Sequence, residues 1–133
     1  MLRLKTIKGF DSFNYIYKNG KRFRTNNISA VIIFNDEKKQ NSSSFEDIVV
    51  NFAVVVGKKT SKKSVIRNRI KRLMRESLRI LAKEDPKIFF YIDKVIFSCF
   101  TAPSRPQLVT LREIMPAIKN ILMQAHFFYK KTE

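Results

Sequence analysis

The pattern of apolar and polar residues along the chain first predicts three β-strands. The runs ISAVIIF (Ile28–Phe34) and IVVNFAVVV (Ile48–Val56) are rich in β-branched residues, and the second is nearly continuous in apolar side chains. We therefore expect two strands there, the second of them buried on both faces of a sheet. The run KVIFSCF (Lys94–Phe100) predicts a third strand, because prolines follow soon after it.

Apolar residues spaced three and four positions apart predict three amphipathic helices. The first covers about Lys8–Lys18 and is expected to end at Gly20 in a left-handed cap. The second lies in the basic stretch Lys58–Arg79, and the third covers about Val109–Tyr129 with an interruption or kink at Pro116. The apolar face expected for the second helix consists of Ile66, Ile70, Leu73, Ser77, Ile80 and Leu81.

The order of these elements, helix, strand, strand, helix, strand, helix, predicts an α+β fold. The residues before the first helix are interpreted as a short basic leader, and a further strand is expected either in Arg22–Asn27 or at Phe45. The strands should form one mixed sheet whose covered face is closed by the apolar sides of the helices. The chain is thus expected to be a single small two-layer sandwich over residues 1–133, with the opposite face of the sheet free to stay open.

The charge of the chain narrows the classes of partner. The formal net charge is +16, from 27 Lys and Arg against 11 Asp and Glu, which points to nucleic acid or to an anionic membrane surface. No apolar run approaches the roughly 18 residues of a spanning helix, and the N-terminal run lacks the apolar core of a signal peptide. We therefore expect no membrane partner. Cys99 is the only cysteine, so we expect no disulfide and a cytoplasmic location.

The basic stretch is the part of the chain with the strongest functional signal. No acid interrupts it between Lys58 and Arg75, and its second half places Asn68, Arg72, Arg75 and Arg79 in one row opposite the apolar face. Neighbouring cations repel one another, and lysines near a helix start oppose the helix dipole. Because stability alone does not explain such a helix, we expect it to bind a dense array of negative charge.

The sequence favours binding over bond cleavage. Its acids are scattered, His126 is the only histidine, and no glycine-rich phosphate loop or metal-ligand spacing occurs, so we expect no catalytic residue and no metal site in this chain. The aromatic side of the first helix, with Phe10, Phe13 and Tyr17 beside Ile16, suits either core packing or stacking of unpaired bases. We assign Phe10 and Ile16 to the core and leave both roles open for the other two.

Val65–Glu76, which reads VIRNRIKRLMRE and follows GKKTSKKS, resembles the signature of the protein subunit of bacterial ribonuclease P. That signature is an Arg-Asn-Arg triplet followed by Lys-Arg and by another Arg one turn later. The similarity extends over most of the chain in the order of elements, from an aromatic first helix to a C-terminal helix. It implies a fold in which the parallel strands are joined across the basic helix in the rare left-handed sense.

The resemblance also implies a function. The holoenzyme of this family, an endoribonuclease, removes the 5′ leader from precursor tRNA, and its catalyst is a large RNA that binds Mg²⁺, with the protein as an accessory. The partners would be ribonuclease P RNA and precursor tRNA, and Phe13 and Tyr17 would lie in the leader-binding cleft. A general RNA chaperone or a ribosomal-type RNA-binding protein is the alternative. The residues that would dock on the catalytic RNA are Lys58, Lys59, Lys62, Lys63, Arg67, Asn68, Arg69, Lys71, Arg72 and Arg75.

Overall fold

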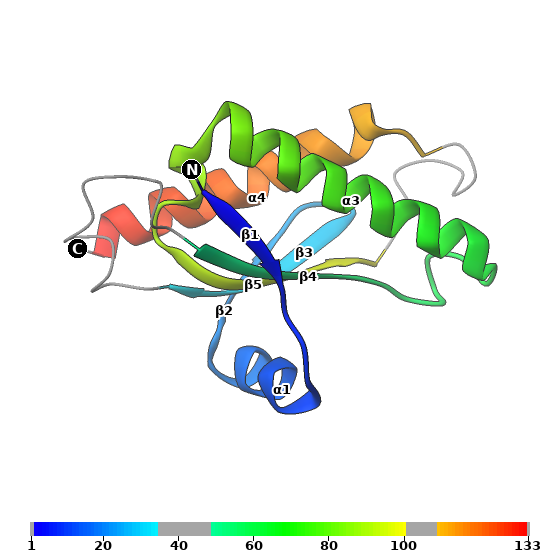
Figure 1. Ribbon diagram of the computed structural model, residues 1–133, viewed down its shortest axis with the longest axis horizontal. Helices are drawn as coiled ribbons and strands as arrows, with labels where there is room; N and C mark the ends of the chain where they lie inside the picture. Colours follow the sequence, from blue (N-terminus) through cyan, green and yellow to red (C-terminus); the bar gives the residue numbers. More distant parts are fainter. Residues whose placement is uncertain (1, 35–48, 101–108, 133) are drawn as a thin grey trace.

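The structure is a computed structural model that describes residues 2–34, 49–100 and 109–132. It contains helices and strands in an order that opens with a strand (Figure 1). The elements are β1 (Arg3–Thr6), α1 (Phe10–Asn19), β2 (Lys21–Arg24), β3 (Ile28–Phe34), β4 (Val49–Val56), α3 (Ser64–Glu84), the 3-10 helix η2 (Pro86–Phe89), β5 (Ile92–Cys99) and α4 (Leu111–Thr132).

The strands form one five-stranded mixed sheet in the order β1-β4-β5-β3-β2. β4 pairs in parallel with both β1 and β5, whereas β3 pairs antiparallel with β5 and β2. Helices α3 and α4 lie side by side on one face of the sheet, and α1 crosses the other face (Figure 1). The expected α+β fold with a mixed sheet is therefore confirmed, and the face expected to be open is partly covered by α1.

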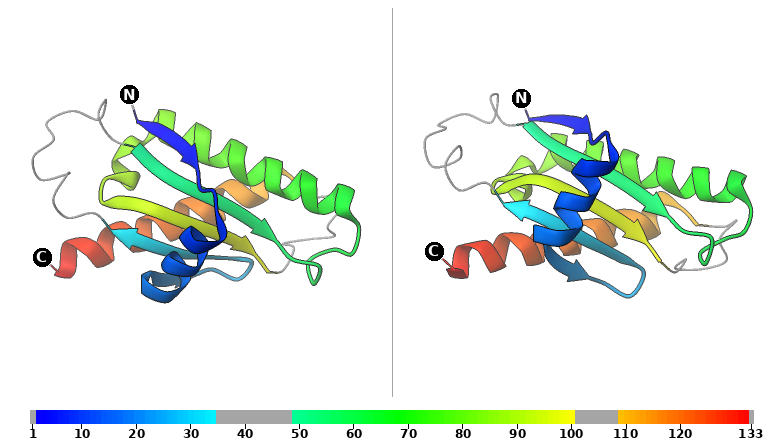
Figure 2. Two further views of the ribbon diagram at one scale, coloured as in Figure 1. Left: turned by 60° about the horizontal axis from the view of Figure 1, so that its bottom comes forward. Right: turned by 90° about the horizontal axis from the view of Figure 1, so that it is seen from below.

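The connection from β4 through α3 to β5 is left-handed. Figure 2 (right) views the sheet from the side of α1, where β4 and β5 run in the same direction and α3 passes behind them. When both strands are turned to point upwards in that view, β5 lies to the right of β4. About 98% of such crossovers have the opposite hand. The arrangement is the one that the family resemblance implies.

Two apolar clusters hold the layers together. The larger lies between the sheet and the helices α3 and α4, and it includes the fully buried Phe97 of β5 and Phe89 of η2. The smaller lies between the sheet and α1, where Ile16 packs with Ile96, Val31 and other residues of the sheet. β5 contributes to both clusters, because Phe97 faces the larger one and Ile96 faces the smaller one.

The buried face of α3 differs from the expected one. Ile66, Leu73 and Ile80 are only half-buried, while Met74 and Leu78, which the expected face omits, are fully buried. The apolar side of α3 is broad enough to accept more than one rotation about the helix axis. Contacts with both the sheet and α4 settle that rotation, and α4 is not visible in a local pattern. The face that is buried consists of Ile70, Met74, Ser77, Leu78 and Leu81.

Three further expectations are corrected. The basic leader contains β1, a short edge strand in which Arg3 and Lys5 are exposed. Charged side chains of this kind prevent edge strands from pairing with other chains, and here they conceal the strand pattern in the sequence. Of the interruption or kink expected at Pro116, the interruption does not occur, because α4 is continuous from Leu111 to Thr132. Since Pro116 and Arg112 are both exposed, the carbonyl that loses its helical partner there can be hydrated. Phe10 is 79% exposed and does not belong to the core. The possible strand at Phe45 lies outside the described residues.

Gly20 ends α1, but not in a left-handed conformation. Its φ is −80°, which any residue can adopt, and its N–H donates to the Ile16 carbonyl at 2.8 Å. Glycine is required for a different reason, because a Cβ at this position would lie 2.4 Å from Val31 Cγ1 and 2.7 Å from the Ile16 carbonyl oxygen. Gly20 therefore lets α1 approach β3 closely.

Gly20→Ala is expected to lower the free energy of unfolding by about 1–3 kcal/mol, because the added methyl group overpacks the contact between α1 and β3. Gly57→Ala is the matched control, since a Cβ there meets no atom within 4 Å. It should be neutral or stabilising by up to about 1 kcal/mol. Urea unfolding followed by circular dichroism measures both. Equal stability of the two variants would show that the close approach at Gly20 is not required.

Candidate nucleic-acid interface

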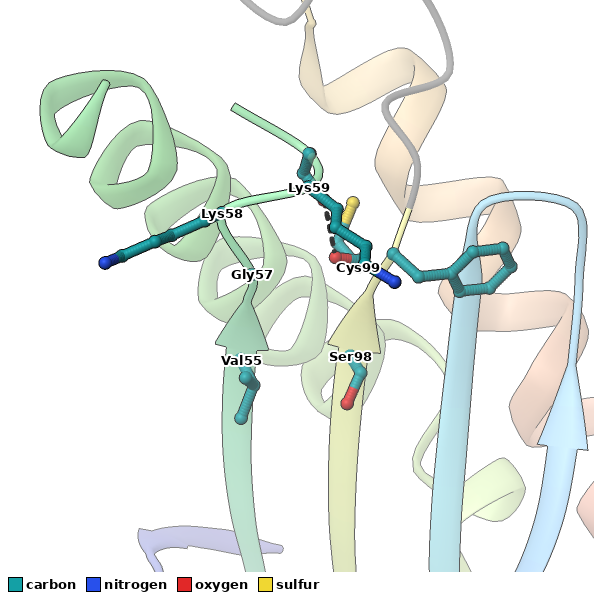
Figure 3. Close-up of a pocket in the computed structure, with 8 residues that line it drawn as sticks. Val55, Gly57, Lys58, Lys59, Ser98 and Cys99 are labelled. Carbon is teal, nitrogen blue, oxygen red and sulfur yellow. Dashed lines mark hydrogen bonds between the residues drawn. The ribbon is translucent and has the colours of Figure 1, made fainter. Parts of the chain in front are cut away.

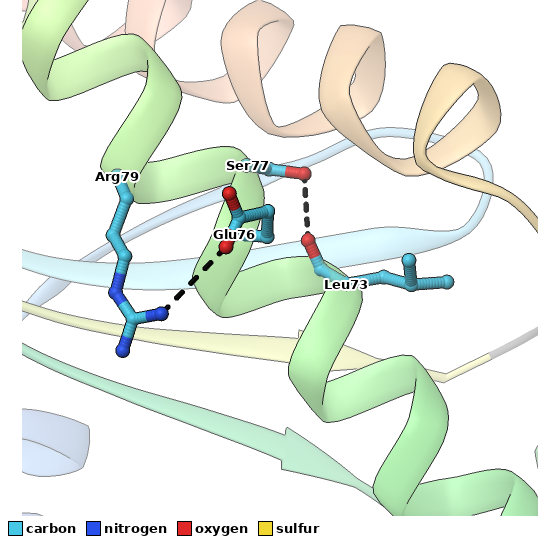
Figure 4. A network of polar contacts seen from close by, with 4 residues as sticks. All are labelled: Leu73, Glu76, Ser77 and Arg79. Atoms are coloured by element: carbon cyan, nitrogen blue, oxygen red, sulfur yellow. Dashed lines mark hydrogen bonds and ion pairs between the residues drawn. The ribbon is translucent and has the colours of Figure 1, made fainter.

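The exposed side of α3 carries the row of polar and cationic side chains expected from its spacing. Asn68, Arg72, Arg75 and Arg79 are all exposed, opposite the buried face of the helix. No acid occurs in the first turn of α3, and Glu76 contacts Arg79 at 3.6 Å. Figure 4 shows this ion pair on the outer side of the helix, while the Ser77 hydroxyl donates inward to the Leu73 carbonyl at 2.8 Å. The row therefore offers guanidinium groups to an external anion.

Two of the expected docking cations also hold the protein together. Arg67 Nη1 donates to the carbonyls of Ser61 and Lys62, each at 2.9 Å, and Arg69 Nη2 donates to the Val109 carbonyl at 3.0 Å. The guanidinium of Arg67 has five N–H groups, so its contacts with the two carbonyls leave donors for a phosphate. Arg67 thus fixes the loop before α3, and Arg69 fixes the approach to α4.

The loop between β4 and α3 is anchored at its centre. Thr60 is buried, and its hydroxyl donates to the Cys99 carbonyl at 2.8 Å. Figure 3 shows the lysines that precede Thr60 leaving the loop in different directions, with Lys58 pointing away from β5 and Lys59 reaching across the end of β5 toward Cys99. The expected docking residues Lys62 and Lys63 are exposed, and Lys71 on α3 is half-buried. The fixed loop therefore spreads its ammonium groups over a wide surface.

The sheet face on the side of α1 is only partly covered. α1 lies over a buried row formed by Ala53, Ile96 and Val31. The next row toward the loop, here called the open row, is half-buried or exposed. The strand register places its members side by side: Val55, Ser98, Ser29 and Arg24. The open row forms a strip that runs between α1 and the basic loop.

Phe13 and Tyr17, the residues expected in a leader-binding cleft, lie on α1 at this strip. Phe13 is half-buried and packs against the smaller cluster, while Tyr17 is 37% exposed. Tyr15 lies on the other flank of the helix, where Lys94 Nζ is 5.7 Å from its ring centroid. At 100° per residue, Tyr17 is on nearly the opposite flank from Tyr15, and that flank faces the open row. The rings of Phe13 and Tyr17 can therefore both border a bound strand.

Among the residues that the structure describes, no group of three or more His, Cys, Asp or Glu could hold a metal ion. The Cys99 thiol is buried, and the ring centroids of His126 and Tyr91 lie 5.7 Å apart on the side of the sheet covered by α3 and α4. In the same described ranges, none of the helices is long and apolar enough to cross a membrane.

Sequence reasoning missed two contributors to this surface. Thr60 fixes the basic loop, but a single threonine among lysines carries no recognisable pattern. Phe100 follows β5 directly and lies under the guanidinium of Arg24, which is 4.4 Å from its ring centroid. Its position continues the alternation through Ile96 and Ser98, so extending that period by one step would have placed Phe100 on the face of α1.

Comparisons with known proteins identify the family. The family profile described as Ribonuclease P matches residues 1–121. The ribonuclease P protein component of Clostridium kluyveri is 30% identical over 122 residues, which cover 92% of this chain and 95% of that protein. The protein of the same name from a strain of Prochlorococcus marinus is 32% identical over 75 residues. That match spans 55% of this chain and just 59% of the length of the relative.

Solved structures show the same fold. The ribonuclease P protein of Thermotoga maritima has a TM-score of 0.67 at 17% identity, covering 90% of this chain and 96% of the other. The Staphylococcus aureus protein has a TM-score of 0.63 at 22% identity, with coverage of 90% and 94%. These likenesses, together with the match over residues 1–121, confirm the resemblance seen in the Arg-Asn-Arg helix. The chain therefore belongs to the Ribonuclease P protein family.

Proposed function

We propose that this chain is the accessory protein of a ribonuclease P holoenzyme, an endoribonuclease that removes the 5′ leader of precursor tRNA. The observation that carries the proposal is the exposed row of α3, which contains Arg72 and Arg75 and begins beside the loop anchored by Thr60. Arginine suits this role because its planar fork donates two parallel hydrogen bonds to one phosphate. We assign the row and the loop to docking on the catalytic RNA.

The uncovered strip of the sheet is assigned to the substrate. A single strand needs a basic groove with aromatic rings at its border, and the open row beside Phe13 and Tyr17 offers both. In this division of labour the catalytic RNA holds the Mg²⁺ ions, and the protein supplies positioning without a reacting group. We further propose a cytoplasmic location, in keeping with a single cysteine in the chain.

Reconstitution tests the function directly. Purified protein alone should leave precursor tRNA uncut, and adding the cognate catalytic RNA should give leader removal at Mg²⁺ concentrations where that RNA alone is slow. Cleavage by the protein without RNA would contradict the proposal. A general RNA chaperone would bind precursor and mature tRNA equally, so varying the leader from zero to several nucleotides separates the two functions. Affinity that ignores leader length would favour the chaperone.

Phe13→Ala is expected to weaken precursor tRNA binding by the holoenzyme by about 1–3 kcal/mol, the range for loss of one stacked base, while leaving the affinity for mature tRNA unchanged. Phe10→Ala is the matched control on the same helix, because Phe10 is 79% exposed and outside both apolar clusters. Equilibrium binding of labelled precursor and mature tRNA measures the difference. Since Phe13 also packs against the smaller cluster, binding is compared at a temperature where both variants are folded.

Equal losses for precursor and mature tRNA would remove Phe13 from the leader-binding cleft. Equal losses for Phe10→Ala and Phe13→Ala would assign the effect to α1 as a whole.

A further inference from the structure

Phe100 lies at the end of the sheet, held in a defined position and capped by a cation. Its N–H donates to the Asn27 carbonyl at 3.1 Å, and the preceding carbonyl, that of Cys99, accepts from Thr60 at 2.8 Å. The guanidinium carbon of Arg24 lies 4.4 Å from the centroid of the ring. The backbone of Arg24 is held too, because its carbonyl accepts from Gln124 at 3.3 Å. The backbones that carry the ring and its cation are thus held by different elements.

The ring of Phe100 borders two hollows on this side of the protein. One has a volume of about 440 Å³ and is lined by Arg22, Phe23, Arg24, Ser29, Ala30 and Phe100. The other, drawn in Figure 3, has a volume of about 390 Å³ and is lined by Val55, Gly57, Lys58, Lys59, Thr60, Ser98, Cys99 and Phe100. Among the residues that the structure describes, neither lining contains an aspartate or a glutamate. Phe100 therefore stands between an arginine pair and a lysine pair.

The chemistry of these linings fits an unpaired nucleotide. An aromatic ring offers a face on which any base can stack, and the serine hydroxyls of the open row can donate to or accept from base edges. The flanking cations suit the phosphates before and after that base. A paired helix would not use this ring, because its bases are stacked on one another. A bare surface contact between Arg24 and Phe100 would need neither the hollows nor the lysine pair.

The place of the ring suggests which strand supplies the nucleotide. Phe100 lies beyond the open row, which begins under the flank of α1 that carries Phe13 and Tyr17. A strand that lies along α1 and the open row would therefore pass directly beside Phe100 and the basic loop. We propose that Phe100 and Arg24 form a stacking platform for one unpaired nucleotide of the precursor leader, with Arg22 and Lys59 on its phosphates. This assignment rests on the proposed function.

The platform is tested with 2-aminopurine placed at one leader position at a time. With the wild-type holoenzyme, stacking should quench the fluorescence of the probe at one position, and Phe100→Leu should abolish that quenching. The same variant should weaken precursor binding by about 5- to 150-fold, the range for one stacked base, and leave mature tRNA binding unchanged. Phe127→Leu on α4 is the matched control, since Phe127 is 64% exposed on the layer of helices.

A second variant keeps the test independent of the ring. Arg24→Gln should reduce both the quenching and the precursor affinity, whereas Lys87→Gln, an exposed cation of η2, should change neither. Thermal unfolding of each variant checks that the fold is kept. Unchanged quenching and affinity in Phe100→Leu and Arg24→Gln would overturn the platform.

The outcomes also separate the platform from the function on which it rests. If the wild-type protein supports leader removal and Phe100→Leu binds precursor normally, only the platform fails. If the wild-type protein supports no leader removal with the catalytic RNA, the proposed function fails. Titration of each variant with the catalytic RNA alone identifies the source of the nucleotide. Weaker docking of Phe100→Leu on that RNA, with unchanged precursor affinity, would overturn the assignment to the leader.

Discussion

Arg72→Ala and Arg75→Ala are each expected to weaken binding to the catalytic RNA by about 1–3 kcal/mol, the range for a hydrogen bond to a charged group. Both side chains are exposed on the same face of α3, one turn apart. The affinity falls as salt rises. If each arginine contacts one phosphate, the slope of log affinity against log salt should be shallower by about 0.9 in each variant. Equilibrium titration of labelled RNA at several salt concentrations measures both quantities.

Arg79→Ala is the matched control for these variants. Arg79 lies in the same row, but Glu76 contacts it at 3.6 Å and balances part of its charge. Its replacement should therefore change the affinity and the salt slope less than the other two replacements do. Equal effects of all three changes would indicate that α3 contributes a diffuse positive potential, without individual phosphate contacts at Arg72 and Arg75.

Leu78→Ala is expected to lower the free energy of unfolding by about 2–5 kcal/mol, because it leaves a cavity in the larger apolar cluster. Leu78 is fully buried between α3 and its neighbours. Ile80→Ala is the matched control on the same helix, because Ile80 is half-buried and does not pack against that cluster. Its cost should stay below about 1 kcal/mol, since alanine also favours the helix. Urea unfolding of both variants gives the comparison.

The two variants also decide between the two possible rotations of α3. A larger loss of unfolding free energy for Ile80→Ala than for Leu78→Ala would place the buried face where the apolar spacing alone predicts it. That result would contradict the packing of α3 in the structure.

Local sequence patterns predict those elements of the fold in which most side chains are buried or half-buried. Ile28–Phe34 forms β3 with the expected bounds, because a short run rich in β-branched residues favours a strand. The edge strand β1 escapes prediction because its four residues alternate charge with partial burial, and its partner β4 is distant in sequence. The face of α3 escapes for the same reason, since α4 helps to set its rotation.

The residues of the candidate site likewise divide into those that the sequence predicts and those that it does not. The exposed arginine row follows from helical spacing, and Arg72 and Arg75 lie where the sequence predicts them. The contact of Arg69 with the Val109 carbonyl could not be predicted, because the two residues lie 40 positions apart in the sequence. The pair of Arg24 and Phe100 is also non-local, since it depends on the pairing of β2 with β3 and of β3 with β5. The positions of the charged residues can thus be predicted from the sequence, whereas the residues that they contact cannot.

The hand of the crossover between β4 and β5 determines which face of the sheet stays partly open. With the same strand order and directions, a right-handed connection would carry α3 across the face on which α1 lies. A 21-residue helix on that face would cover Val55, Ser98 and Ser29, and no strip would remain for a single strand. The left-handed path instead sends α3 behind the sheet while its first turn still begins at the basic loop. The chirality of one connection thus keeps the face that we propose for RNA binding open, without any change in side chains.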